Sequence, residues 1–584
     1  MLISFVLGIS VAAPRLPDSP FSVSTQPSKI RIFNLTNTIF DIRILALSAV
    51  GIVAQRSPEL ATVDAAEQPA PGPTGQGGSS ALSAWHLTLL PAALDYSLQY
   101  DLPSLLKAFR TDFAGYILCE SASGQGGPGS DNGSMHVAIG LAGILRALVV
   151  TQATEDIAKS VGLPLMLDTR NMTLAAAFES FKSEYSTKLL YNQQHTNLAH
   201  TTDWAVYAKA FALYDATLTM PLAQAALKRL DPISMVLGWG SEVDFVTSAS
   251  RFGHQVLCSD YTTNVPVFSN FGLSPQELLP HRPSRRTPSR PSHVTMPTTA
   301  PVNGSTASPA ISHGTTPNMA PGPAAPNRAP KCTAAAGDTR HTATFMFTDG
   351  DSLTWDLGNF ASPAYDWWGS KWRGTVPIAW TFQPVLQELH PYFLRWVHLN
   401  ATTNDTLLVG PSGAGYTYLD RYPGGPARAR FGAWTSDNIE RSGLLNMINQ
   451  IQVGTFDSAV ELEQLALKTP PEALFIDEEV QLSIHGDAWR LRDASGAPTD
   501  TVVTSRRHTL SKSLVPLLNG APQRPDSPDG YSVVGVEVWG YGVSDIARVA
   551  GNLDATRVRV VGLEEYVACL KERALPSKQT MQTH

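Results

Sequence analysis

This sequence has little charge, few cysteines and no long apolar run. Charged residues make up 16% of its 584 positions, where a soluble domain typically has about 25%, and the formal net charge is −7. The lack of a basic excess argues against nucleic acid as a partner. Four cysteines are too few for a disulfide framework in a chain of this length, and Cys119 and Cys258 lie in apolar runs that predict burial. No stretch after the N-terminus has about 18 consecutive apolar residues, so we expect no membrane span.

The composition instead indicates several folded domains. Hydrophobic residues make up 43% of the chain, and the length exceeds what one core can hold. One segment, rich in Pro, Ser, Thr and Ala, cannot bury enough apolar surface to fold and is predicted to be a disordered linker. The expected division is a signal peptide or disordered start at 1–27, an N-terminal region at 28–272, the linker at 273–338, a C-terminal domain at 339–575 and a disordered tail at 576–584.

The N-terminus leaves two interpretations open. MLISFVLGISVAA has the apolar core and small residues of a secretory signal peptide, but it lacks the positively charged start. Six Asn-x-Ser/Thr triplets fit a secreted glycoprotein. They begin at Asn34, Asn132, Asn171, Asn303, Asn400 and Asn404. We therefore expect a secreted or luminal protein.

The order of apolar segments predicts an α/β fold. In the N-terminal region, short apolar runs such as KIRIFNL and GYILC alternate with helical patterns, which favours a mainly parallel sheet. IFDIRILALSAVGIVAQ is predicted to be an amphipathic helix, and Asp437 to cap a helix over residues 437–450. About seven strand–helix pairs after residue 340 predict a C-terminal (β/α)-barrel-like domain.

Two motifs in the C-terminal domain suggest a ligand site. SGAGYTY at 412–418 places Gly413 and Gly415 beside Tyr416 and Tyr418, so it combines backbone freedom with amphipathic rings. FMFTDGDSLTW at 345–355 reads as a strand that ends in two carboxylates. Acids beside aromatic rings suit a sugar better than a nucleotide or a membrane.

These segments resemble the GxGYxYP family of putative glycoside hydrolases. Gly413, Gly415, Tyr416 and Tyr418 match its motif, but Leu419 stands where the family has Pro. The resemblance covers about residues 28–272 and 340–574, including VPIAWTFQPVLQELHP and VLGWGSEVDFVTSASRFG. It implies a carbohydrate ligand or substrate, with these four motif residues lining the sugar subsite.

Acids at the carboxyl ends of the predicted strands are the candidate catalytic groups, because ligands of parallel α/β folds bind there. Glycoside hydrolysis normally uses two carboxylates that flank the scissile bond. The candidates are Asp349, Asp351, Asp477, Glu478 and Glu537. Turn capping is the structural alternative for the Asp-Gly-Asp pair, and a solvated edge for the acids at 477–479.

Tryptophans are concentrated in the same domain, where nine of the twelve lie at or after Trp355. Aromatic planes stack on the apolar faces of sugars, so we expect Trp355, Trp368 and Trp539 to contact the substrate. The WWGSKW run at 367–372 is predicted to form an exposed rim, whereas Trp380 and Trp396 are predicted to pack in the core.

Other functions remain as alternatives. GQGGPG at 124–129 has the spacing of a dinucleotide loop but contains Pro128, and GPSGAG at 410–415 lacks the last Gly of a nucleophile elbow. A metal-dependent polysaccharide deacetylase would also begin with paired Asp residues, but the His residues show no metal-ligand spacing. We expect no metal and no cofactor. A non-catalytic carbohydrate-binding protein is the remaining alternative.

Overall fold

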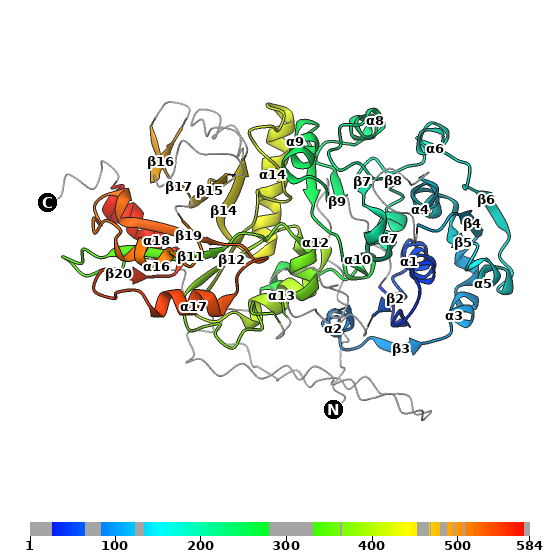
Figure 1. Ribbon diagram of the computed structural model, residues 1–584, viewed down its shortest axis with the longest axis horizontal. Coiled ribbons are helices and arrows are strands. Elements are labelled where there is room, and N and C mark those ends of the chain that lie inside the picture. The colour runs from blue at the N-terminus through cyan, green and yellow to red at the C-terminus, as the bar shows by residue number, and fades with distance from the viewer. Residues whose placement is uncertain are drawn as a thin grey trace, which may run out of the picture.

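The computed structural model describes residues 26–64, 83–122, 133–279, 331–361, 365–452, 467, 469–478, 488–493, 497–505 and 508–576. We call 26–279 the N-terminal half and 331–576 the C-terminal half. Figure 1 shows them side by side. Residues 1–25, the segment 280–330 and residues 577–584 lie outside the described parts, and with them most of the predicted signal peptide, linker and tail.

The N-terminal half contains three small parallel sheets, as the alternating pattern predicts. Their strand orders are β2-β1-β3, β5-β4-β6 and β10-β9-β7-β8. The strands are β1 Lys29–Asn34, β2 Leu60–Val63, β3 Asp95–Gln99, β4 Gly115–Cys119, β5 Ala147–Thr151, β6 Leu165–Asp168, β7 Leu189–Asn192, β8 Phe211–Leu213, β9 Met235–Gly238 and β10 Gln255–Leu257. The helices are α1 Phe40–Ala54, α2 Ser83–Thr88, α3 Leu102–Ala108, α4 Ser134–Leu145, α5 Glu155–Ser160, α6 Leu174–Phe181, α7 Leu198–Tyr207, α8 Pro221–Arg229, α9 Glu242–Arg251, α10 Val265–Phe268 and α11 Pro275–Leu278.

The C-terminal half is built on one 10-stranded sheet of order β16-β17-β15-β14-β13-β12-β11-β19-β18, with β20 paired to β11. Of its described strand pairs, only β16–β17 is antiparallel. The strands are β11 His341–Phe347, β12 Ile378–Phe382, β13 Asp405–Val409, β14 Leu445–Gln452, β15 Ala473–Glu478, β16 Ala488–Arg492, β17 Pro498–Ser505, β18 His508–Thr509, β19 Tyr531–Val536 and β20 Val558–Val560. The helices are α12 Leu386–Leu389, α13 Pro391–Asn400, α14 Pro426–Ser442, α16 Leu514–Asn519, α17 Val543–Gly551 and α18 Leu563–Cys569.

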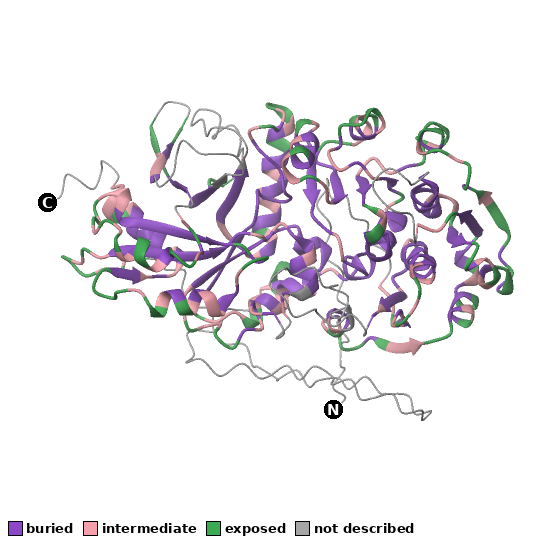
Figure 2. Cartoon of the chain, in the orientation of Figure 1, coloured by how far each residue is buried: buried purple, intermediate pink, exposed green. Residues whose placement is uncertain are grey.

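Both faces of the central strands β11, β12, β13 and β19 are buried (Figure 2), as the continuous apolar strands of a parallel sheet require. Successive residues point to opposite faces. Accordingly, Phe347 and Ile448 belong to the hydrophobic cluster shared with the N-terminal half, while Met346 and Met447 belong to a second cluster together with residues of α18. The second cluster fills the other face. None of the described helices is long and apolar enough to cross a lipid bilayer.

Three predictions of local structure are wrong. Helix α1 is buried almost all round rather than amphipathic, because it packs between α7 and the sheet of β5. Asp437 lies inside α14, which ends at Gly443 with a left-handed φ of 69°, so the residues that follow form β14. The predicted linker begins too early, since Ser274 caps α11 through a bond from the Glu277 amide.

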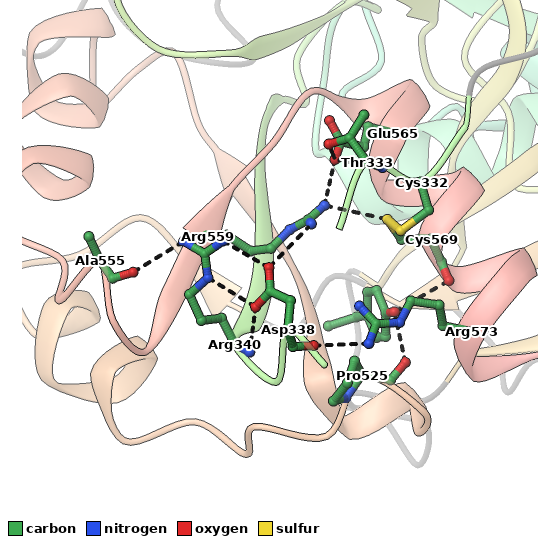
Figure 3. Close-up of polar contacts among 11 residues, drawn as sticks. Cys332, Thr333, Asp338, Arg340, Pro525, Ala555, Arg559, Glu565, Cys569 and Arg573 are labelled. Atoms are coloured by element: carbon green, nitrogen blue, oxygen red, sulfur yellow. Dashed lines mark hydrogen bonds and ion pairs between the residues drawn. A yellow bond between two sulfur atoms is a disulfide. The ribbon is translucent and has the colours of Figure 1, made fainter. Parts of the chain in front are cut away.

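The amino end of the large sheet is fastened by a charged network and a disulfide (Figure 3). Arg340 holds Asp338 with bonds of 3.0 and 2.8 Å and lowers the pKa of that carboxyl to about 2. Arg559 donates to Glu565 at 2.6 Å, and Cys332 is bonded to Cys569 of α18. A cavity of about 650 Å³ opens beside these residues. Because its charged lining groups are paired with one another, we interpret the network as structural.

The disulfide joins residues that are 237 positions apart, so it restricts the unfolded chain strongly. We expect reduction to lower the free energy of unfolding by about 2–4 kcal/mol. Thermal unfolding with and without a thiol reductant measures this. In the Cys332→Ser/Cys569→Ser double variant, the reductant should have no further effect; an equal effect in both proteins would contradict the assignment.

A histidine pair joins the two halves. His86 Nδ1 of α2 lies 3.1 Å from His390 Nε2 at the start of α13, and the His390 ring stacks on Phe268 with centroids 4.2 Å apart. Burial lowers the pKa of His86 to about 3, and burial together with the neighbouring His86 places the pKa of His390 well below its usual range. Both rings are therefore neutral at neutral pH.

Depressed histidine pKa values make the fold sensitive to acid. Below pH 6.5 the unfolded chain takes up protons that the buried rings do not, so stability is full above pH 6.5 and falls as the pH drops toward 3. Each such ring contributes a slope of about 1.4 kcal/mol per pH unit. Denaturant unfolding between pH 7 and pH 5 should give a shallower slope for His86→Gln than for the wild type. Identical slopes would refute this origin of the acid sensitivity.

Candidate functional site

The SGAGYTY segment follows β13 and lies between the two halves. Val256 of β10 and Tyr416 form an antiparallel bridge, with N···O distances of 2.8 and 3.0 Å. The Tyr416 hydroxyl donates to Glu242 Oε1 at 2.7 Å, and the Tyr418 amide donates to Ser250 Oγ at 3.0 Å. Both tyrosine side chains are 0% exposed. The segment therefore fastens the C-terminal half to the third N-terminal sheet, and neither tyrosine side chain is exposed in this conformation.

The two glycines of the motif permit this contact. Gly413 has a φ of 125°, which side chains rarely adopt, and a Cβ there would meet Thr435 at 3.0 Å. A Cβ on Gly415 would lie 2.5 Å from Gln255 Cβ. The glycines thus act through close packing rather than through contact with a ligand. Leu419, which replaces the motif's Pro, is buried.

Asp349 and Glu537 meet at the carboxyl ends of neighbouring parallel strands. Asp349 follows β11, is half-buried, and accepts a bond of 3.2 Å from the Val538 amide and one of 3.1 Å from the Thr348 hydroxyl. Val538 follows Glu537, which is exposed at the end of β19. The structure thus brings these two predicted residues together. The side chains of Asp477 and Glu478, at the end of β15, lie outside the described parts, so their roles stay predictions.

Asp351 meets acids of the N-terminal half around Cys258. The Leu353 amide donates to the Cys258 carbonyl at 2.8 Å, and the Asp260 amide donates to Thr354 Oγ1 at 2.8 Å. Burial, and after it the charges of Asp351, Asp260 and Glu242, raise the pKa of the Cys258 thiol well above its usual value. Three carboxylates from two halves therefore lie near one buried sulfur atom.

Asp260 is a functional candidate that the sequence reasoning missed. Burial raises its pKa, while bonds from Asn197, at 3.0 Å, and Gln193 lower it in part. An acid that keeps its proton longer than usual suits proton donation. The signal was present in the sequence, since Asp260 directly follows the apolar run HQVLCS.

Asp356 is a second acid that was missed. It is 1% exposed, and neither carboxylate oxygen has a hydrogen-bond partner within the described residues. Burial, and then the charge of Asp351, raise its pKa well above the usual range. The side chain therefore keeps its proton to a higher pH than an exposed Asp does. In the sequence, Asp356 lies within the apolar segment after Asp351, and no local feature distinguishes it from an acid on the protein surface.

The predicted aromatic residues divide into buried and exposed ones. Trp355 and Trp368 are 1% and 3% exposed, and Trp367 is also buried, so the predicted exposed rim is wrong for Trp367 and Trp368. The three rings pack against other aromatic rings, including the buried Trp380. Trp539 is 40% exposed, two residues after Glu537. Of the three tryptophans predicted to contact substrate, only Trp539 is accessible in this conformation.

Buried amides form part of the same end of the large sheet. Gln383 directly follows β12 and is 0% exposed, and neither of its amide atoms has a partner within the described residues. Asn449 of β14 donates to the Thr348 carbonyl at 3.3 Å, but its Oδ1 has no partner there. Neither residue was predicted, because an amide in an apolar strand looks like part of the core.

The described residues do not support the rival sites. They contain no group of three His, Cys, Asp or Glu side chains that could hold a metal ion. Ser412 is buried, and its hydroxyl exchanges bonds of 3.2 and 3.4 Å with the backbone of Ile451. The GQGGPG loop lies outside the described parts.

These features define an α/β protein with a carboxylate-rich site where two halves meet. Residues 339–571 match the family model described as "GxGYxYP putative glycoside hydrolase C-terminal domain". Residues 187–270 match the "GxGYxYP third domain" and residues 113–189 the "GxGYxYP_N second domain". The chain belongs to the GxGYxYP family.

A solved structure supports the fold along nearly the whole length. It is described as "a putative hydrolase from Bacteroides thetaiotaomicron VPI-5482". It has a TM-score of 0.74 and 20% sequence identity, and the match covers 97% of this chain and 99% of that one. At this identity the likeness shows the fold alone. None of the curated proteins matches this chain.

The close packing of Gly415 can be tested by substitution. Gly415→Ala should lower the free energy of unfolding by about 1–3 kcal/mol, because the new methyl group overlaps Gln255 between the halves. Gly424→Ala is the matched control, since a Cβ there meets nothing within 4 Å. Thermal unfolding of both variants measures the difference. Equal melting temperatures would show that residue 415 has room for a methyl group beside Gln255.

Proposed function

We propose that this protein hydrolyses glycosidic bonds at the site between its two halves. The carrying observation is that hydrogen bonds of 2.8 Å hold the segment from Cys258 to Asp260 against the segment that follows Asp351, so that acids of both halves act on the pKa of Cys258. Glycoside hydrolysis needs one carboxyl group that is protonated and a second that is ionised. The family description supports a carbohydrate as the substrate.

The environments of these acids support different roles. Asp260, whose pKa is raised by burial, is the proposed proton donor to the leaving oxygen. Asp351, half-buried on the opposite half, is the proposed partner that attacks the sugar or activates water. Tyr416 holds Glu242 through its hydroxyl and is proposed as a positioning residue. Asp349 and Glu537 remain candidates for binding sugar hydroxyls, with Trp539 as the exposed stacking surface.

The site would lie at the open end of a barrel. Strand β17 pairs with β15 at one end of the sheet, and β18 pairs with β19 at the other. Only residues 506 and 507 separate Ser505 of β17 from His508 of β18, so those two Cα atoms lie within about 11 Å. We propose that this short connection closes the sheet, which would group the carboxyl ends of its strands around one opening.

We further propose that the protein works outside the reducing cytosol. The disulfide between Cys332 and Cys569 supports this, because such bonds persist in oxidising compartments.

The catalytic proposal is tested with a panel of glycans as substrates. Asp260→Asn and Asp351→Asn should each lower kcat/KM by at least about a hundredfold. Because Asp260 must be protonated, wild-type activity should fall as the pH rises through its raised pKa, and Asp260→Asn should lose that limb of the profile. Asp244→Asn, on the exposed face of α9, is the control.

Three results would change the proposal. Full activity in both site variants would remove these acids from catalysis. Glycan binding by the wild type without cleavage would favour a non-catalytic binding protein. Metal-dependent release of acetate from an acetylated glycan, without cleavage of the chain, would favour the deacetylase.

A further inference from the structure

Gln383 and Asn449 carry buried polar atoms that the proposed acid chemistry does not use. A Gln amide offers two donors and one acceptor oxygen, and in Gln383 none of these is bonded within the described residues. An unbonded buried polar group costs about 1–3 kcal/mol. Such a group therefore indicates a site for water or for a polar part of a ligand.

Both residues lie on the same face of the large sheet. Ala379 of β12 and Met447 of β14 belong to the second hydrophobic cluster. Because side chains alternate along a strand, Asn449 lies on the face of Met447, and Gln383 continues the face of Ala379. On this face of the sheet, apolar side chains are thus followed by amide side chains near the carboxyl ends of the strands.

This face lies directly beside Asp349. The Asn449 side chain donates to the Thr348 carbonyl at 3.3 Å, and the Gly350 amide donates to Thr381 Oγ1 at 3.0 Å. The backbone on both sides of Asp349 therefore contacts β12 and β14, the strands next to the two amides.

The chemistry of these groups selects an uncharged ligand group. Gln383, Asn449, Thr348 and Thr381 supply donors and acceptors but no positive charge that could balance a carboxylate or sulfate. We propose that Gln383 and Asn449 bind an uncharged hydroxyl or acetamido substituent of the sugar beside Asp349. This inference rests on the proposed carbohydrate function.

The test uses Gln383→Met, which keeps the side-chain length and removes the amide. Without ligand, its melting temperature should rise by about 2–4 °C, because an unbonded buried amide is lost. Glucose, N-acetylglucosamine and glucuronate, each at millimolar concentration, are the probes in calorimetric titrations. The wild type should bind one or both neutral sugars and not glucuronate, and Gln383→Met should bind the neutral sugar at least tenfold more weakly.

Gln387→Met is the matched control. Gln387 is also buried, but its amide donates to Asn438 at 2.9 Å, so this variant should melt at a lower temperature and retain sugar affinity. Equal sugar affinity in the wild type and Gln383→Met, or no binding of any probe by the wild type, would overturn the inference. Sugar binding that depends on Gln383 in a protein that cleaves no glycan would uphold it while rejecting the hydrolase.

Discussion

The backbone pairing of Val256 with Tyr416 is the contact on which the arrangement of the site depends. Two residues after Val256, the Cys258 carbonyl accepts a hydrogen bond from the Leu353 amide. Two residues further on, the Asp260 amide donates a hydrogen bond to Thr354 Oγ1. One extended segment of the N-terminal half is therefore held by the SGAGYTY segment and by the segment that follows Asp351. A shift in this pairing would move Asp260 relative to Asp351, although neither acid takes part in it.

Crowding of carboxylates has a predictable electrostatic result. Acids that are close together and partly removed from water cannot all ionise near neutral pH, so some retain protons. Burial is the largest cause for both Asp260 and Asp356, and the more accessible Asp351 adds to the shift of Asp356. The same field keeps the Cys258 thiol protonated, which makes that sulfur a poor nucleophile.

The sequence predicted the helices and strands, but it did not predict which side chains pack against one another in the folded protein. Alternating apolar runs predicted parallel α/β sheets in both halves because strand and helix periods are local properties. Burial of Trp368 was not predictable, because its neighbour Gly369 is typical of exposed loops while the rings of Trp380 and Trp396 that pack on it come from β12 and α13. The hydrogen bond between the Asp260 amide and Thr354, 94 positions further on, likewise has no counterpart in the local sequence around either residue. Contacts between distant segments leave no local pattern.

The composition of the motif follows from its position between the halves. Glycine allows the backbone of residue 415 to approach Gln255, and tyrosine supplies a large apolar ring whose hydroxyl must find a partner when buried. For Tyr416 that partner is Glu242, one of the three acids near Cys258. Tyr416 therefore contributes both to the contact between the halves and to the position of the Glu242 carboxylate. Since Asp351 comes from one half and Asp260 and Glu242 from the other, neither half holds the whole set of acids by itself.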